Sequence, residues 1–477
     1  MENLANLQPQ AVFHWFYELN QIPRGSGNET AVSNWLKAWA EERNLEVEQD
    51  EALNIIIRKP GSAGYENSPI VAIQGHMDMV CEKTPESTHD FLKDPIEMFV
   101  DGDWLKAKDT TLGADDGIAV AYGLAVLDAD DIAHPPLEVI VTTSEETGMD
   151  GAQALKSEQI KAKYLLNIDS DVEGSFILGC AGGADLFSRF SFAKEAVSEK
   201  RGYKLLIKGL QGGHSGQMID QELGNAIKVL ARILFKLKND NELRLSSFIG
   251  GSKHNAIPTQ AEAIFTYQGN AEEDFAKTFA EIKNELSHVD PELSYELSEV
   301  EIEEAMSICD SHKLIDFLHA VPHGVQAMSM AMPGLVETSL NIAIMSEEDN
   351  QQVLQISVRS ALNSAKLNLV EKIITLTQYF GGKGECSGQY PAWEYNPESS
   401  LIDKVKDIYK ETSGNDSEII AIHAGLECGL LGEILPETEM VSFGPTMHDI
   451  HTFRERLSIS STERYWNFLL KLLASFK

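Results

Sequence analysis

Five short segments of the sequence combine carboxylate and imidazole side chains with glycine or a second acid. Carboxylate oxygens and imidazole nitrogens are ligands that zinc and similar divalent ions bind in proteins. Placing so many acids together is unfavourable unless cations neutralise them. The set therefore predicts a metal site, and its segments are 74–78 (Gln-Gly-His-Met-Asp), 113–117 (Gly-Ala-Asp-Asp-Gly), 144–148 (Ser-Glu-Glu-Thr-Gly), 167–169 (Asn-Ile-Asp) and 444–451 (Gly-Pro-Thr-Met-His-Asp-Ile-His).

Two of these segments indicate how their side chains could divide the chemistry. In an extended chain, residues two apart share a face, so His76 and Asp78 point the same way. Asp78 can then accept a hydrogen bond from the free imidazole N–H of His76 and fix its tautomer. Glu145 and Glu146 are neighbours and cannot share a strand face, so one can bind metal while the other reaches a water molecule on the metal.

Each segment taken singly also has a simpler structural interpretation. A Glu-Glu pair is more often part of a solvated loop, and a histidine at a strand end is more often a hydrogen-bonded structural residue. Asp115-Asp116-Gly117 could be a helix cap or a turn. The metal site is favoured because the segments follow successive apolar runs.

These apolar runs predict the elements that position the segments. Short runs indicate strands at 53–57, 70–74, 137–143, 164–168, 419–422 and 440–443, and helical spacing covers 9–20, 29–43, 118–127, 152–157 and 463–476. Strands this apolar are typically buried on both faces, which predicts an α/β fold with a mostly parallel sheet covered by helices. In such a sheet, ligand-bearing residues collect where the strands end.

The middle of the chain has a different pattern. Two-residue alternation at 185–192, 203–208, 261–267 and 355–359 predicts half-buried strands, and amphipathic helices are expected at 222–238 and 272–287. We therefore expect an inserted α+β lid domain at 184–392, interrupting a zinc-binding catalytic domain made of 1–183 and 393–477. The insert is long enough for two similar α/β units, although no sequence repeat proves them.

The composition favours a folded, soluble protein of the cytoplasm. A chain of 477 residues with 43% hydrophobic residues is expected to form two domains. A formal net charge of −35 disfavours nucleic acid and anionic membranes as partners. Five scattered cysteines, without a Cys-x-x-Cys pair, fit reduced thiols. The sequence has neither a secretory signal nor the roughly 20 apolar residues of a membrane helix.

The ordered set of motifs resembles the cocatalytic-zinc peptidase family, which includes aminoacylase, glutamate carboxypeptidase and the carnosinases. The motifs are Gly-His-Met-Asp, Gly-Ala-Asp-Asp-Gly, Ser-Glu-Glu-Thr-Gly, Asn-Ile-Asp and a C-terminal Gly-Pro followed by histidine. Gly-Gly-His-Ser-Gly at 212–216 and His-Ala-Gly-Leu-Glu-Cys-Gly at 423–429 resemble one branch, the bacterial aminoacyl-histidine (Xaa-His) dipeptidases. The resemblance covers nearly the whole chain.

The resemblance implies two Zn2+ ions per chain, with Co2+ or Mn2+ able to substitute. Asp115 would bridge the two ions. One ion would also bind His76 and Asp169, and the other would bind Glu146 and His451. The spacing to an acidic residue further along the chain favours His451 over its neighbour His448 as the ligand.

The resemblance also implies the roles of the remaining residues. Glu145 would be the general base, Asp78 would orient His76, and the peptide bond after Asp115 would be cis. His214 would polarise the scissile carbonyl. The substrate-binding positions would be Asn255, Arg359 and Gly425.

The implied activity is hydrolysis of unblocked dipeptides by a dizinc-bound hydroxide, preferentially Xaa-His such as β-alanyl-histidine, in a homodimer. A related dizinc amidohydrolase is the alternative: an N-acyl amino acid deacylase, a tripeptidase or a carboxypeptidase. A catalytically silent peptide-binding protein on the same fold is less favoured, because every ligand position and the base are present. Serine hydrolysis is disfavoured because no Gly-x-Ser-x-Gly motif occurs.

Overall fold

The computed structural model describes residues 6–198 and 200–477, which form two compact units. The first unit extends to Gly179 and also contains Tyr395–Ala421 and Leu426–Lys477. The second unit contains Cys180–Glu394 and the short segment Ile422–Gly425. In this segment Ile422 and Ala424 accept hydrogen bonds from the backbone N–H of Ala181. The chain therefore passes between the units four times.

The sheet of the first unit carries strands from both ends of the chain. Over the described residues it has eight strands in the order β1-β2-β6-β3-β7-β21-β8-β20. The central strands β6, β3, β7 and β21 pair in parallel, whereas β1, β2 and β8 run antiparallel to their neighbours. The bounds are β1 Glu46–Gln49, β2 Ile55–Lys59, β3 Val71–His76, β6 Leu137–Thr142, β7 Tyr164–Asn167, β8 Ser175–Cys180, β20 Glu418–Ile422 and β21 Glu439–Ser442.

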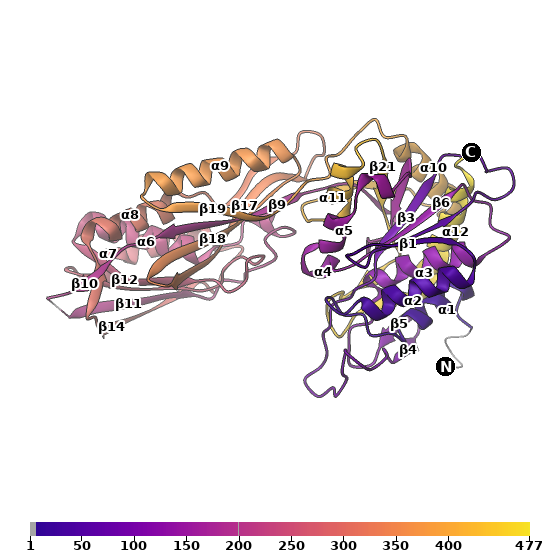
Figure 1. Cartoon of the computed structure of the whole chain (residues 1–477). Helices are drawn as coiled ribbons and strands as arrows, with labels where there is room; N and C mark the ends of the chain where they lie inside the picture. Colours follow the sequence, from indigo (N-terminus) through magenta and orange to yellow (C-terminus); the bar gives the residue numbers. More distant parts are fainter. Residues whose placement is uncertain (1–5, 199) are drawn as a thin grey trace. The chain divides into compact units, whose positions relative to one another are not determined.

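Helices surround this sheet, as Figure 1 shows for α1, α3, α10 and α12. Every residue of β3 and β6 is buried, as expected for strands covered on both faces. The helices are α1 Gln10–Leu19, α2 Thr30–Glu42, α3 Ala114–Asp128, α4 Glu145–Gly148, α5 Asp150–Ala154, the short 3-10 helix η1 Ser157–Gln159, α10 Leu401–Ser413, α11 Glu427–Ile434 and α12 Ile459–Ala474. A smaller sheet joins β4 Met98–Asp101, β5 Trp104–Ala107, β23 Arg456–Ser458 and β22 Met447–His448. The α/β class predicted for this part of the chain is confirmed.

The second unit is an antiparallel sheet with helices on one face. Its strands follow the order β14-β11-β13-β12-β17-β18-β9-β19, and β16 pairs with β17. The bounds are β9 Gly182–Phe190, β11 Arg201–Lys208, β12 Leu243–Gly250, β13 Ala261–Tyr267, β14 Ser294–Glu301, β16 Gly324–Met328, β17 Val336–Glu348, β18 Gln351–Ser360 and β19 Lys383–Tyr390. A separate short ribbon pairs β10 Lys194–Ala196 with β15 Glu304–Met306. The inserted α+β character predicted for this region is confirmed.

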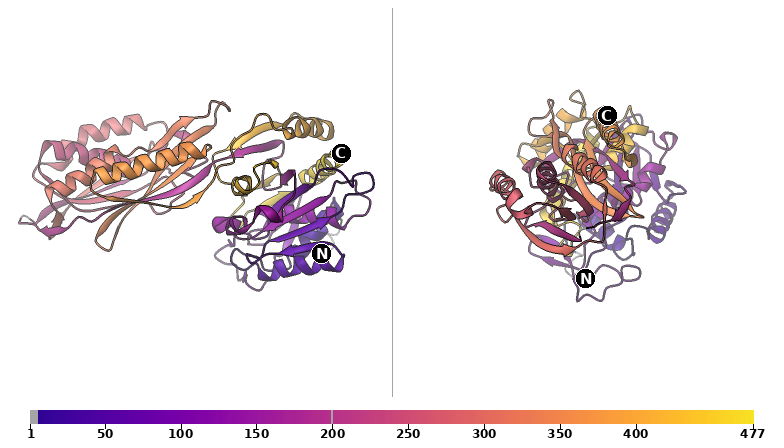
Figure 2. Two further views of the ribbon diagram at one scale, coloured as in Figure 1. Left: turned by 45° about the horizontal axis from the view of Figure 1, so that its top comes forward. Right: turned by 90° about the vertical axis from the view of Figure 1, so that its left-hand side faces the viewer.

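Figures 1 and 2 show helices α6 to α9 along one face of this sheet. They are α6 Ala226–Asp240, α7 Ala271–Glu285, α8 Ile308–Ala320 and α9 Asn363–Tyr379, and the short 3-10 helix η2 Ile219–Gln221 precedes α6. One hydrophobic core joins their buried faces to the strands, including Leu230, Phe275, Phe317 and Ile373. Helix α6 packs against β11, β12 and β13, α8 packs against α6 and β12, and α9 packs against β9, β18 and β19.

The helix predicted at 222–238 begins four residues later than expected. The side chain of Asn225 accepts hydrogen bonds from the backbone N–H groups of Ile227 and Lys228, which caps α6 at Ala226. Glu222 has a left-handed backbone with φ of 54°, which is incompatible with a helix. The apolar periodicity of the sequence continues on the N-terminal side of this cap, so it predicts a helix start that is too early.

Among the described residues, no helix is long and apolar enough to cross a membrane.

Candidate metal centre

Three parallel strands bring the predicted ligand segments to one edge of the sheet. His76 is the last residue of β3, and Asp169 lies two residues beyond β7. Strand β6 ends at Thr142, opposite His76, and Glu145 and Glu146 follow it at the start of α4. Because neighbouring parallel strands end at the same edge, these side chains occupy one neighbourhood.

Asp115 occupies the centre of this neighbourhood. Its Oδ1 lies 3.2 Å from Nε2 of His76, and its Oδ2 lies 3.0 Å from Nε2 of His451. The peptide bond between Asp115 and Asp116 is cis. The two oxygens of one carboxylate thus face two different imidazoles.

Histidine and carboxylate side chains form one group on each side of Asp115. Among the described residues, the candidate ligand atoms that lie within 4.8 Å of one another belong to three sets: His76, Asp116 and Asp169; His76, Glu145 and Glu146; and Asp115, Glu146 and His451. Nε2 of His76 lies 3.8 Å from Oδ1 of Asp169. On the other side, Nε2 of His451 lies 3.0 Å from Oε1 of Glu146. Within the group of Asp115, Glu146 and His451, the candidate ligand atoms all lie within 4.8 Å of one another. Both groups combine imidazole with carboxylate, which is a suitable donor set for zinc.

Asp78 connects these ligands to the Glu145–Glu146 pair. Its Oδ1 lies 3.3 Å from Nδ1 of His76, and the side chain is fully buried. The same carboxylate accepts hydrogen bonds from the backbone N–H of Glu145 at 3.1 Å and of Glu146 at 3.3 Å. Ser26 donates a further hydrogen bond at 2.7 Å. One buried carboxylate therefore orients an imidazole and the start of α4 together.

The electrostatics of these side chains indicate a demand for positive charge. Burial lowers the pKa of His451, but hydrogen bonds to Asp115 and Glu146 outweigh it and raise this pKa to about 11. Burial also lowers the pKa of His76, and its bonds to Asp115 and Asp78 likewise raise it well above the usual value. The carboxylates around both imidazoles therefore favour positive charge at these positions. Divalent cations would supply the same charge, so the residues fit a metal centre.

Glu145 has a pKa suited to proton transfer. Burial raises this pKa, the charge of His76 opposes the rise, and the neighbouring carboxylates of Glu427 and Glu146 add to it, so that the pKa lies at about 8. A carboxyl group in this range can hold or release a proton near neutral pH.

Two buried acids near the site were not singled out in the sequence. Asp116 is fully buried, and its Oδ2 accepts a hydrogen bond from the backbone N–H of His76 at 3.3 Å. It also belongs to a possible ligand group with His76 and Asp169. Glu427 is fully buried and accepts hydrogen bonds from Gln74 and Thr142. Only their tertiary surroundings distinguish them from ordinary surface acids.

His448 lies apart from these ligand groups. It is exposed in β22, and its ring centroid is 5.2 Å from that of Trp104. Among the described residues it belongs to none of the groups that could hold a metal. His451, three residues later, has a left-handed backbone with φ of 61° and reaches Asp115.

The second unit contains the predicted lid residues. Nδ1 of His214 accepts hydrogen bonds from the backbone N–H groups of Gly216 at 3.2 Å and Gln217 at 3.1 Å. Burial, followed by the charges of Arg359 and His254, lowers the pKa of His214. His214 is therefore a neutral imidazole whose remaining proton is on Nε2, a hydrogen-bond donor.

Arg359 lies on β18 in the same unit, where its Nη1 donates a hydrogen bond to Tyr390 at 3.1 Å. Its Nε is buried and has no hydrogen-bond partner within the part of the chain that the structure describes. His423 is buried nearby on the 422–425 segment, with its Nε2 2.7 Å from Oγ of Ser339. Gly425 ends that segment. The guanidinium group keeps a donor available for a ligand.

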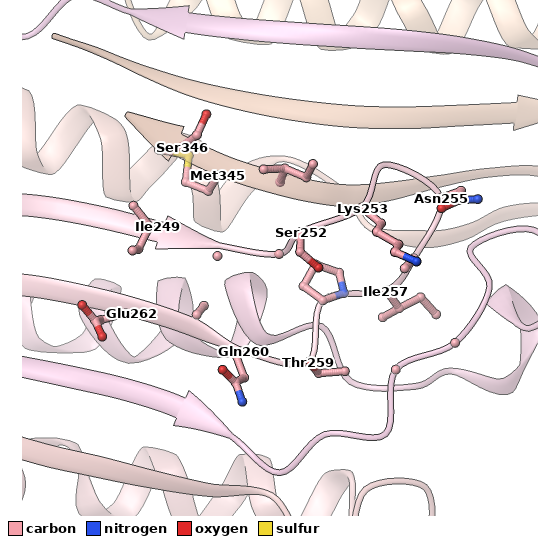
Figure 3. A pocket seen from close by; sticks show the side chains of 18 of the residues that line it. Ile249, Ser252, Lys253, Asn255, Ile257, Thr259, Gln260, Glu262, Met345 and Ser346 are labelled. Carbon is pink, nitrogen blue, oxygen red and sulfur yellow. The ribbon is translucent and has the colours of Figure 1, made fainter. Parts of the chain in front are cut away.

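A cavity of about 840 Å³ lies in the second unit, and both His214 and Asn255 line it. Figure 3 shows Asn255 and Lys253 on a loop beside the strands that carry Ile249 and Met345. The backbone carbonyl of Asn255 accepts a hydrogen bond from the N–H of Ser215 at 2.9 Å, which ties this loop to the His214 turn.

Known proteins resemble the chain over its whole length. A family model described as a peptidase dimerisation domain (M20_dimer) matches residues 201–294. The cytosol non-specific dipeptidase of Escherichia coli (strain K12) is 40% identical over 479 residues, covering 99% of both chains. The crystal structure of the aminoacylhistidine dipeptidase from Vibrio alginolyticus matches with a TM-score of 0.91 and 36% identity, covering 99% of this chain and 98% of that one. A tripeptidase from Staphylococcus aureus, with 19% identity and a TM-score of 0.56 over 98% of each chain, shares the fold alone.

The fold, the ligand groups and these matches define the class of protein: the chain is an enzyme, a metallopeptidase. It belongs to the M20 family, whose members use divalent metal ions. The family resemblance inferred from the sequence motifs is thereby confirmed.

Proposed function

We propose that the enzyme hydrolyses unblocked dipeptides at a centre of two zinc ions and prefers Xaa-His substrates such as β-alanyl-histidine. The observation that carries the two-ion centre is the position of Asp115, with one oxygen 3.2 Å from His76 and the other 3.0 Å from His451. A carboxylate in this position is suited to bridge two ions. The dipeptide preference is supported by the names of the relatives from Escherichia coli and Vibrio alginolyticus.

The proposed ligand sets follow the two groups around Asp115. His76 and Asp169 complete one site, and Glu146 and His451 complete the other, with Co2+ or Mn2+ able to replace zinc. Ions bound there would supply a Lewis acid that polarises the peptide carbonyl and acidifies water. Asp116 holds the backbone of His76, so it supports this loop rather than binding metal in the proposal.

Glu145 is the proposed general base. It takes a proton from the attacking water and later returns it to the amine that leaves. Its carboxyl group has a pKa of about 8, and neighbouring cations, which favour the carboxylate, would lower this pKa. Asp78 keeps the backbone of Glu145 fixed during both transfers.

His214 is the proposed donor to the oxygen of the scissile carbonyl. Its Nδ1 is engaged by two backbone N–H groups, so Nε2 carries the proton. A donor aimed at an oxygen that gains negative charge stabilises the transition state. Asn255, Arg359 and Gly425 complete the proposed substrate contacts.

A substrate panel tests the proposal as a whole. Zinc-loaded enzyme should cleave Xaa-His dipeptides best, other dipeptides less well, and tripeptides and N-acyl amino acids poorly. Chelation should abolish all of these activities, and zinc should restore them. Efficient cleavage of tripeptides or acyl amino acids would instead establish a related amidohydrolase on the same metal centre.

The His214→Ala variant is expected to lose turnover by roughly 10²-fold, the effect of removing one oxyanion donor. Its zinc content should equal that of the wild type, because His214 is not a proposed ligand. Steady-state kinetics and metal analysis measure the two quantities. His288→Ala is the matched control, since His288 is an exposed histidine of the same unit. Wild-type kinetics in His214→Ala would make His214 a structural turn residue.

Arg359 is expected to bind the C-terminal carboxylate of the substrate, because its planar guanidinium matches a carboxylate with two donors. For the wild type, amidation of a dipeptide should raise KM strongly. In Arg359→Ala the difference in KM between free and amidated dipeptides should nearly vanish. Arg359→Lys, which keeps the charge without the fork, should give an intermediate difference. An unchanged difference in Arg359→Ala would assign carboxylate binding to another residue.

We also propose that the enzyme works in the cytoplasm as a homodimer. The Escherichia coli relative is named a cytosol enzyme, and the matched family model is described as a dimerisation domain. Sedimentation of the purified protein tests the oligomeric state.

A further inference from the structure

Two fully buried charged residues lie beside the metal centre without being among its proposed ligands. Arg24 is 1% exposed and comes from the loop between α1 and α2. Glu455 is 3% exposed and comes from the loop before β23, near the other end of the chain. Burying a charge is costly unless strong hydrogen bonds compensate. The hydrogen bonds of Arg24 and Glu455 therefore show which backbone segments each side chain stabilises.

Arg24 connects the two loops that carry His76 and Asp115. Its Nη1 donates to the backbone carbonyls of Met77 at 3.0 Å and Asp78 at 3.2 Å. Its Nη2 donates to the backbone carbonyl of Gly113 at 2.5 Å. A planar guanidinium can make these contacts to both loops at once. Arg24 therefore ties the two loops together, in addition to the hydrogen bond from the backbone N–H of His76 to Asp116.

Glu455 holds the second of these loops from its N–H side. Its carboxylate accepts hydrogen bonds from four consecutive backbone N–H groups, of Leu112 at 2.7 Å, Gly113 at 3.0 Å, Ala114 at 2.7 Å and Asp115 at 3.3 Å. The backbone of Asp115 and Asp116 is not helical, so these N–H groups belong to a loop that precedes the regular part of α3 and need an acceptor from elsewhere in the chain. The backbone N–H of Asp115, the proposed bridging residue, and those of the three residues before it thus all donate to one carboxylate.

Gly113 lies between the two buried charges. Its N–H donates to Glu455, and its C=O accepts from Arg24. A Cβ at Gly113 would lie 2.5 Å from Nη2 of Arg24, and one at Gly117 would lie 2.6 Å from the same atom. Both glycines are therefore required for the guanidinium to approach this closely.

The charges stabilise each other through this loop. Burial lowers the pKa of Arg24 to about 10, and the negative charges of Glu455, Asp78 and Asp116 oppose this effect. Arg24 therefore stays protonated at neutral pH, and its contacts are charge-assisted.

We infer that Arg24 and Glu455 are positioning residues for metal binding, which fix the separation of His76 and Asp115 and thereby determine the affinity of the centre for zinc. The inference rests on the proposed function, because it assumes that His76 and Asp115 are metal ligands. Groups that orient ligands commonly change metal affinity by roughly 10- to 100-fold when they are replaced. A role in fold stability alone would leave the affinity of the folded protein unchanged.

The test compares zinc affinity in folded proteins. Arg24→Lys keeps the charge, but one ammonium group cannot reproduce the fork between the loops, so its zinc Kd should rise by roughly 10-fold or more. Glu455→Gln keeps the shape but loses the charge and one acceptor, so a similar rise is expected. Arg43→Lys, at a surface arginine that pairs with Asp128, is the control and should bind zinc as the wild type does.

Zinc Kd is measured by competition with a chelator, at a temperature where circular dichroism shows each variant to be folded. Excess zinc should restore much of the turnover lost at limiting zinc, with KM for the dipeptide unchanged. If Arg24→Lys does not fold, Glu455→Gln carries the test. A wild-type Kd in folded variants would overturn the inference, whereas a wild type that binds no zinc would overturn the proposed function instead.

Discussion

The Glu145→Ala variant is expected to bind zinc like the wild type and to lose turnover by roughly 10³-fold, within the range of general acid–base contributions. The side chain belongs to neither proposed ligand set, and the backbone N–H of residue 145 can still donate to Asp78. Removing the carboxyl group therefore removes the proton acceptor and leaves the ligands in position. Steady-state kinetics and metal analysis of the purified variant measure both effects.

The adjacent residue provides the matched comparison. Glu146→Ala should lose zinc, because Oε1 of Glu146 lies 3.0 Å from His451 within the second ligand group. Its turnover should partly return when excess zinc is added, whereas that of Glu145→Ala should not. Loss of zinc from Glu145→Ala, with retention in Glu146→Ala, would show that the two roles are exchanged.

The Asp115→Ala variant is expected to lose both ions and nearly all activity. Each of its oxygens faces a different histidine, so one substitution removes the ligand that the two proposed sites share. A Lewis-acid metal supplies several kcal/mol of transition-state stabilisation. Since each ~1.4 kcal/mol corresponds to a factor of ten in rate, turnover should fall by roughly 10³-fold or more.

His451→Ala is the comparison for Asp115→Ala, because His451 is proposed to bind one ion whereas Asp115 is proposed to bind both. It removes a ligand from one group only, so it should weaken one site and leave the other able to bind. Asp150→Ala, which removes an exposed carboxylate in the same unit, is the control for charge and should keep both ions. If Asp115→Ala retains one tightly bound ion, Asp115 does not bridge the two sites.

The neighbourhood of the metal centre could be predicted because it depends on local pattern. Strands β3, β6 and β7 are apolar runs, and parallel neighbours of this kind end at one edge. The polar residues that follow them, among them His76, Glu146 and Asp169, are therefore close together wherever the sheet forms. Their individual roles remain predictions.

The buried residues Arg24 and Glu455, which hold the loops of the candidate metal centre, could not be predicted from local pattern. Glu455 accepts hydrogen bonds from residues more than 300 positions earlier in the chain, and Arg24 contacts Gly113 across 89 positions. No spacing within the sequence reports such a contact. The sequence does not distinguish a buried arginine or glutamate from an exposed one, so only the tertiary structure shows that these two side chains are buried. The α/β pattern after residue 393 likewise predicts that segment 422–425 belongs to the catalytic domain, whereas this segment clusters with the second unit.

The position of β21 has a consequence for how the chain folds as it is synthesised. This strand lies between β7 and β8 in the sheet, although it follows both of them by more than 250 residues in the chain. Until it emerges from the ribosome, the facing edges of β7 and β8 have no strand to pair with, and open edges invite association with other chains. The large sheet of the second unit is complete once β19 has been made. Synthesis therefore favours folding of the inserted unit first, and the sheet of the first unit can be completed only after β21 has been made.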